Sequence, residues 1–138
     1  MADNSVITVS IVTPDGKVYE HTASMIVVST QSGQLGIMAN HVPIIATLDV
    51  DETRVKYDDK EDDIAVNGGF IEFSNNVATI VADSAETQND IDIARAEKAK
   101  KNAQQRIADA RQRQDKAALD RAQVALRRAV NRINVAGK

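Results

Sequence analysis

Apolar and polar residues alternate along the first two thirds of the chain, a pattern typical of half-buried β-strands. In residues 6–12 the alternation places Ile7, Val9 and Ile11 on one face. Further short apolar runs follow at 17–21, 24–29, 35–38, 43–50, 54–57, 63–66, 70–73 and 77–82. Turn-forming residues lie between runs, at 14–16, 32–33, 58–60, 67–69 and 75–76. About nine to ten short strands at this spacing predict a β-sandwich or a flattened barrel.

The period of the pattern changes from 2 to 3.6 residues near residue 88. One helical stripe consists of Ala96, Ala99, Ala103, Ile107 and Ala110, and a second consists of Ala118, Ala122, Ala125, Leu126, Ala129, Val130 and Ile133. Residues 111–116 separate the stripes, and Asp115 is a suitable N-cap for a second helix. The sequence therefore predicts an α+β protein, with a β-domain at 1–87 and an antiparallel α-helical hairpin at 88–138.

The predicted hairpin is weakly specified. Alanine-rich faces let two helices approach closely but bury little apolar area, so their association contributes little stability. The connection at 111–116 contains neither glycine nor proline, and every residue from 91 to 135 tolerates a helix. Two states are therefore plausible, a folded hairpin and a nearly continuous helix. The alternative is an ordinary hairpin that is docked permanently on the sandwich.

Charge separates the same two modules. The whole chain has a net charge of −3, but residues 1–89 carry 4 Lys/Arg and 14 Asp/Glu, whereas residues 90–138 carry 13 and 6. Modules of opposite charge suggest different partners. The chain has no cysteine, which excludes disulfides and thiolate chemistry. It has no signal-like start and no long apolar run, so we expect a protein on the cytoplasmic side that meets the membrane only through partners.

Several kinds of chemistry find no support in the residues. No P-loop motif is present, so we expect no ATP hydrolysis by this chain alone. His21 and His41 lack neighbouring ligands at metal-like spacing, and we expect no metal site. A nucleic-acid-binding adaptor would use the basic helices, but no aromatic residue follows Phe73 to stack on bases. We therefore expect no nucleic-acid partner.

Four segments resemble, in this order, segments of the epsilon subunits of bacterial F-type ATP synthases. They are VTPDGKVYE at 12–20, SGQLGIMANHVPIIA at 32–46, NGGFIEF at 67–73 and ALRRAVNRINVA at 125–136. The resemblance covers essentially the whole chain and implies a β-sandwich followed by a helical hairpin. The family usually has Pro-Gly before a His-x-Pro motif, where this chain has Ala39 and Asn40. Because asparagine tolerates positive φ, we expect Asn40 to preserve the turn.

The resemblance implies a non-catalytic subunit of the rotor stalk, peripheral to the cell membrane on its cytoplasmic side. In that family the sandwich packs on the gamma subunit and touches the c-ring, and helps to couple proton flow to the catalytic head. The hairpin is able to extend into the head, where its basic helices meet alpha and beta subunits and restrain ATP hydrolysis. Attraction between a basic segment and an acidic surface weakens with salt.

The resemblance also implies a regulatory ATP site, with no cofactor required. Some members bind ATP through an Ile/Leu-Asp-x-x-Arg-Ala motif on the first helix and two arginines on the second, and this holds the hairpin closed. The matching positions here, with an acidic residue used near the nucleotide, are Glu86, Ile91, Asp92, Arg95, Ala96, Arg128 and Arg132. A further arginine of those members is replaced by Asn102.

Side-chain chemistry is compatible with this assignment. Arg128 and Arg132 are four residues apart on one helix face and suit phosphate oxygens. Arg95 would join them only in a folded hairpin. An alternative interpretation makes Asp92 a helix-start acid favoured by the helix dipole. A further alternative for the whole chain is a structural coupling subunit without nucleotide sensing.

Overall fold

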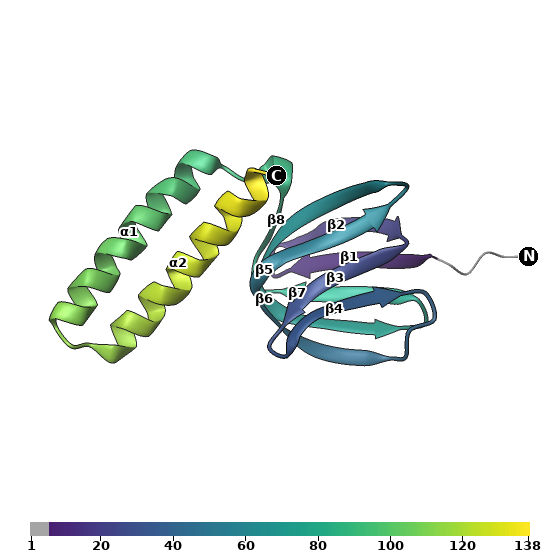
Figure 1. Cartoon of the computed structure of the whole chain (residues 1–138), viewed down its shortest axis with the longest axis horizontal. Helices are drawn as coiled ribbons and strands as arrows, with labels where there is room; N and C mark the ends of the chain where they lie inside the picture. Colours follow the sequence, from purple (N-terminus) through teal and green to yellow (C-terminus); the bar gives the residue numbers. More distant parts are fainter. Residues whose placement is uncertain (1–5) are drawn as a thin grey trace, which may run out of the picture.

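The computed structural model describes residues 6–138 and consists of a β-sandwich followed by two antiparallel helices (Figure 1). The strands are β1 (Ile7–Thr13), β2 (Gly16–Ala23), β3 (Met25–Thr30), β4 (Gly33–Met38), β5 (Ile44–Tyr57), β6 (Lys60–Ser74), β7 (Val77–Ala82) and β8 (Ala85–Thr87). A 3-10 turn, η1 (Gln88–Asp90), leads into α1 (Ile93–Gln112) and α2 (Lys116–Ala136). The predicted α+β class, with a sandwich before a hairpin, is confirmed.

The described residues form fewer and longer strands than expected. The runs predicted at 43–50 and 54–57 are both part of β5, and those at 63–66 and 70–73 are both part of β6. Short β8 has no alternating pattern and was not predicted. Two long strands replace four because they pair with each other along almost their whole length.

All eight strands belong to one sheet, in the order β2-β1-β7-β6-β5-β3-β4, with β8 paired to β6. No pairing joins β2 to β4 among the described residues, so the sheet is an open sandwich and the flattened-barrel alternative is wrong. The sheet folds over on itself (Figure 1). It encloses an aliphatic core in which Phe73 is the largest fully buried side chain. This agrees with an aromatic content of only 3%.

Gly68 and Gly69 bend β6 instead of forming the turn between strands that was expected. Both have positive φ, at 91° and 121°. A Cβ on Gly69 would lie 2.1 Å from the Val81 carbonyl oxygen, so the close approach to β7 requires glycine. Beyond the bend β6 pairs with β7, and before it residues 64–66 pair with β8. The bend therefore fixes where β8 lies.

The tight turns agree with the sequence. Asp58-Asp59 and Asn75-Asn76 join consecutive antiparallel strands, and all four residues have φ between 48° and 61°. Residues of this kind favour two-residue hairpin loops because their side chains tolerate the left-handed region. Asn40 has φ 68°, as expected for its turn.

The connection between the helices is a Schellman motif without glycine. Gln114 has φ 54°, and its N–H donates to the Arg111 carbonyl at 3.1 Å. The N–H of Asp115 donates to the Ala110 carbonyl at 2.9 Å. The Asp115 side chain then caps α2 by accepting from the N–H of Ala118 at 3.1 Å, which confirms the predicted cap.

The hairpin touches the sandwich mainly through α2, whose last turns lie on β5 and β6 (Figure 1). Val135 is fully buried there and packs against Ala65 of β6 and Ile91. Neither α1 nor α2 is long and apolar enough to cross a membrane.

Candidate functional site between the two modules

A cavity of about 520 Å³ lies between the hairpin and the sandwich. This volume is within the range of about 300–1,000 Å³ for small-molecule sites. Its walls come from the β1–β2 turn, the β7–β8 segment and the two helices. The lining residues are Thr13, Asp15, Asp83, Ser84, Ala85, Glu86, Asp90, Asp92, Arg95, Ala96, Ala99 and Arg132. A ligand in this cavity would touch both modules.

Five of the seven residues expected to form a nucleotide site line this cavity. They are Glu86 of β8, Asp92, Arg95 and Ala96 at the start of α1, and Arg132 of α2. Ala96 is buried against the partner helix, and its small side chain keeps that side of the cavity open. The arginines come from different helices, so both reach the cavity only when the hairpin is folded.

Two expected residues, Ile91 and Arg128, lie outside the cavity lining. Ile91 is buried with Ala65 and Val135 in the contact between hairpin and sheet, so it holds the modules together. Arg128 is half-buried, and its Nε has no hydrogen-bond partner within residues 6–138. Arg128 and Arg132 lie four residues apart on one face of α2, but only Arg132 lines the cavity.

Asp92 is the N-cap of α1. Its Oδ1 accepts from the backbone N–H of Arg95 at 3.0 Å, while its own backbone is extended. The carboxylate therefore starts the helix and faces the cavity at the same time. Arg95 is exposed, and its guanidinium forms no ion pair with any residue in the described range 6–138.

Arg132 forms an ion pair and hydrogen bond through its Nε to Glu86 Oε1. Both side chains are about three-quarters buried, at 26% and 31% exposed. The pair joins the last third of α2 to the short strand β8. An incoming anion would have to share Arg132 with this carboxylate.

Several lining residues were missed by sequence reasoning, chiefly Thr13, Asp15, Asp83 and Ser84. They reach the cavity because β1 and β7 pair in parallel, with Val12 opposite Val81. Parallel neighbours end on the same side, so the turn after β1 lies beside the segment after β7. No local signal in the sequence reports this long-range parallel pairing.

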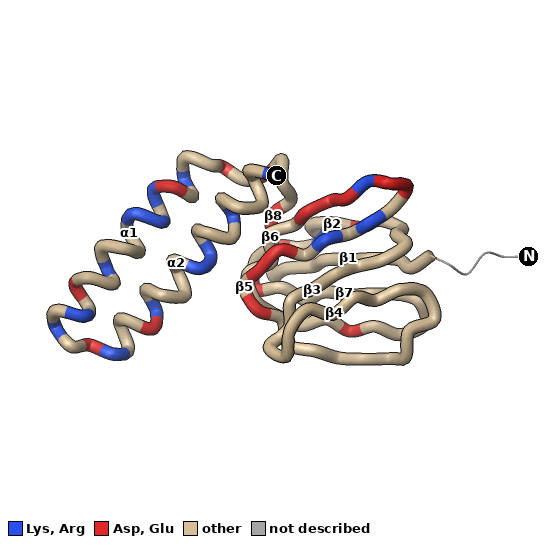
Figure 2. The backbone as a smooth tube through the Cα atoms, viewed as in Figure 1, with Lys and Arg blue, Asp and Glu red and all other residues tan. Residues whose placement is uncertain are grey.

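Acidic groups outnumber basic ones around the cavity. Five carboxylates line it, from Asp15, Asp83, Glu86, Asp90 and Asp92, against the two guanidiniums of Arg95 and Arg132. Figure 2 shows the wider pattern, with most basic residues on the helices and a run of acidic residues along β5 and β6. A polyanion in the cavity would be held by the two arginines against this surrounding charge.

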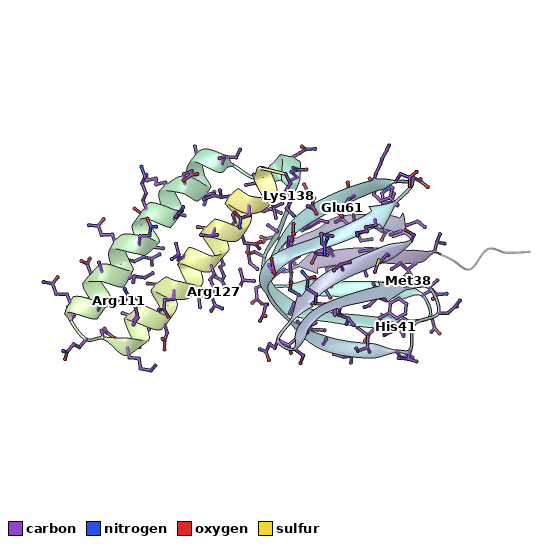
Figure 3. All side chains as sticks on the ribbon, viewed as in Figure 1. Met38, His41, Glu61, Arg111, Arg127 and Lys138 are labelled. Atoms are coloured by element: carbon purple, nitrogen blue, oxygen red, sulfur yellow. The ribbon has the colours of Figure 1, made fainter. Side chains whose placement is uncertain are left out.

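A second exposed feature lies on the sandwich far from the hairpin. Met38, Val42 and Ile45 are 56%, 69% and 71% exposed. Figure 3 shows Met38 and His41 on the side of the sandwich away from the helices. The His41 ring packs edge-on against Phe73, with ring centres 5.9 Å apart. These three residues lie at or near the connection between β4 and β5, and exposed apolar side chains that gather in one place are typical of protein contact sites.

Comparison with known proteins identifies the family. Residues 6–88 match the model of the ATP synthase delta/epsilon chain β-sandwich domain, and residues 89–137 match that of its long α-helix domain. The chain is 63% identical over 136 residues to the ATP synthase epsilon chain of Pediococcus pentosaceus, covering 98% of both chains. It is 64% identical over 137 residues to that of Levilactobacillus brevis, covering 99% of both.

A solved structure supports the fold. The chain resembles a chain in the Euglena gracilis mitochondrial ATP synthase structure of OSCP, F1 and c-ring, with a TM-score of 0.79 and 21% identity. The match covers 100% of this chain and 85% of the other. The chain therefore belongs to the ATP synthase delta/epsilon family, among its non-catalytic epsilon chains.

Proposed function

We propose that this subunit couples rotation to catalysis through its sandwich and regulates hydrolysis through its hairpin, which ATP holds in the docked state. The observation that carries the proposal is the cavity between the modules, lined by Arg95, Arg132 and Glu86. A ligand that contacts all three binds only a hairpin that is both folded and docked. Such a ligand shifts the equilibrium toward that state.

The lining suits a nucleotide. Two guanidiniums supply bidentate donors for phosphate oxygens. Asp92 and Glu86 supply acceptors for an exocyclic amino group of a base. Arg132 leaves or shares its pair with Glu86 when phosphate enters, so binding replaces one charged contact with another. Arg128 contributes in this account only after a side-chain rearrangement.

The partners follow from the two exposed surfaces. The apolar cluster of Met38, Val42 and Ile45 suits contact with the c-ring or the gamma subunit, which anchors the protein indirectly on the cytoplasmic face of the membrane. The basic hairpin suits acidic segments of the alpha and beta subunits once it extends. Extension places the helices in the head and restrains hydrolysis.

An ATP titration of the isolated full chain tests the nucleotide site. Calorimetry should detect saturable ATP binding for the wild type and binding at least about tenfold weaker for Arg95→Ala, because a hydrogen bond to a charged group is lost. Arg121→Ala removes the same charge from an exposed position outside the cavity lining and should bind like the wild type. Absence of binding by the wild type would leave a structural coupling subunit without nucleotide sensing.

A truncation tests the division of labour. A subunit ending at residue 89 should still assemble with gamma and support proton-coupled ATP synthesis, while the assembled enzyme hydrolyses ATP faster than with the full chain. Failure of the truncated subunit to bind gamma would contradict the role given to the sandwich. Unchanged hydrolysis would contradict the role given to the hairpin.

A further inference from the structure

Within the described part of the chain, α2 places a buried polar side chain against the sheet. Asn131 is 6% exposed, and its Nδ2 donates to the Val66 carbonyl and to the Asn67 side-chain Oδ1, both at 3.3 Å. Asn67 is fully buried in β6. Burial of an amide without these acceptors would cost free energy. The docked state therefore depends on a match between Asn131 on α2 and its acceptors on β6.

The polar contact continues to the wall of the cavity. Asn67 donates from Nδ2 to Ser84 Oγ at 3.0 Å and from its backbone N–H to the Ser84 carbonyl at 2.9 Å. Ser84 lines the cavity. The residue after Asn131 is Arg132, which reaches Glu86 in the same cavity. The docking contact and the ion pair are therefore neighbours on one helical turn.

Apolar packing alone does not define how α2 lies on the sheet. The cluster there consists of Ala65, Ile91 and Val135, with Ala136 partly buried beside it. Such packing is non-directional and tolerates a small shift or rotation of the helix. The two hydrogen bonds of the Asn131 amide tolerate neither a shift nor a rotation, because the strength of a hydrogen bond falls steeply with distance and angle. Buried polar groups fix register in helical interfaces for the same reason.

We propose that Asn131 is a positioning residue: it selects one register of α2 on β6 and thereby places Arg132 in the cavity. The part of this inference that concerns Arg132 and ATP rests on the proposed function. The part that concerns the docking of α2 on β6 is independent of it. When α2 leaves the sheet, Asn131 is hydrated and Asn67 keeps its bonds to Ser84, so the contact is specific and still reversible.

The docking equilibrium can be measured by thiol labelling, because the chain has no native cysteine. Val135→Cys introduces a thiol that is fully buried only while α2 lies on the sheet. Its labelling rate, divided by that of the same thiol in denaturant at the same pH, reports the undocked fraction. Val28→Cys, in the sandwich core away from α2, reports global unfolding and serves as the reference.

Asn131→Leu in the Val135→Cys background should raise the labelling rate roughly tenfold, since the Val66 carbonyl and Asn67 Oδ1 lose their donor. Val28→Cys should label at an unchanged rate with the same substitution. A rate within twofold of the parent would overturn the proposal, because docking would then depend on apolar packing alone.

Asn131→Asp distinguishes a directional hydrogen bond from mere packing. At pH 8 the carboxylate faces two acceptors and should increase labelling at least as much as Asn131→Leu. Burial of this carboxyl against two acceptors raises its pKa. As the pH falls toward 5 the acid therefore becomes protonated and can donate again, so labelling should return toward the parent rate. Other charged side chains around α2 are Glu86, Glu52, Asp63 and Lys138. Asn131→Leu carried through the same pH range controls for any effect of pH that does not involve residue 131. Asn134→Asp, exposed on the same helix, controls for added charge.

Outcomes for ATP separate the two proposals. ATP should slow labelling of the Val135→Cys protein, and it should need a higher concentration to do so with Asn131→Leu. If ATP has no effect but Asn131→Leu still raises labelling, the nucleotide site fails and the docking role stands. If ATP slows labelling equally in both, and Asn131→Asp shows no pH dependence beyond that of Asn131→Leu, the role of Asn131 is wrong.

Discussion

Arg132 of α2 and Glu86 of β8 are paired, although they are 46 residues apart in the chain. Both line the cavity between the modules, so the pair occupies the position where a ligand would meet the second helix. The contact joins α2 to the sandwich. Under the proposed function, Arg132 would serve first in docking and then in recognition of the ligand.

Arg132→Lys tests whether the shape of the guanidinium matters. The lysine keeps the charge and an ion pair with Glu86, but it lacks the planar fork that matches phosphate oxygens. We expect ATP binding to weaken about tenfold, the effect of losing a hydrogen bond to a charged group, with little change in thiol labelling at Val135→Cys. Equal ATP affinity of the wild type and Arg132→Lys would mean that Arg132 acts only as a point charge.

Gln114 should tune the balance between hairpin and extended helix. Its φ of 54° is a conformation that costs an L-residue about 1 kcal/mol and glycine almost nothing. Gln114→Gly should therefore favour the hairpin about fivefold, by about 1 kcal/mol. Asp115→Ala removes the cap of α2, which a continuous helix does not need, and should act in the opposite direction.

Spin labels can follow this change. Lys98→Cys and Arg127→Cys place labels on exposed positions of α1 and α2. The labels would be about 44 Å apart in a continuous helix and far closer in the hairpin. Gln114→Gly and Asp115→Ala should shift the two distance populations in opposite senses. A shift of both in the same sense would show that the turn does not control extension.

Asn102→Arg should strengthen ATP binding. Ala99 lines the cavity, and residue 102 is one helical turn beyond it on the same side of α1. An arginine there adds a cation next to a cavity in which carboxylates predominate, and the gain should be about tenfold in affinity. Gln104→Arg, which adds the same charge at another exposed position, is the matched control. Equal gains for both would indicate general charge attraction.

Ionisation of Asp63 should lower the free energy of unfolding as the pH rises. Burial, aided by the neighbouring carboxyls of Glu61 and Glu52, raises its pKa to about 6, while Lys138 acts in the opposite direction. Figure 3 shows Lys138 at the end of the hairpin and Glu61 on the neighbouring part of the sandwich. Because the folded protein binds this proton more tightly than the unfolded chain, the contribution of Asp63 to stability declines between about pH 4 and pH 6.

Asp63→Asn removes that titration. Thermal unfolding should show the variant more stable than the wild type at pH 7, with the difference shrinking as the pH falls toward 4. The Lys138 pair with Glu52, at 2.6 Å, remains in both proteins and does not account for the difference. A constant difference across this range would mean that Asp63 does not titrate as its surroundings indicate.

Local patterns determined much of this protein from the sequence. Alternation identified the sandwich, the 3.6-residue period identified the helices, and Asp115 was recognisable as a cap because capping involves only residues three positions apart. The grouping of Asp92, Arg95 and Ala96 was predictable for the same reason, since a single helical turn brings them together. Contacts of this kind are decided within a few residues of chain.

Only the tertiary structure decided what those groups face. The parallel pairing of β1 and β7 brings Asp15 to the cavity, and the bend at Gly69 sets the position of β8 and Glu86. Asn131 could not be distinguished from an exposed polar residue until its acceptors on β6 were known. These contacts join residues tens of positions apart, and their energy depends on how the whole chain packs, which no local period encodes.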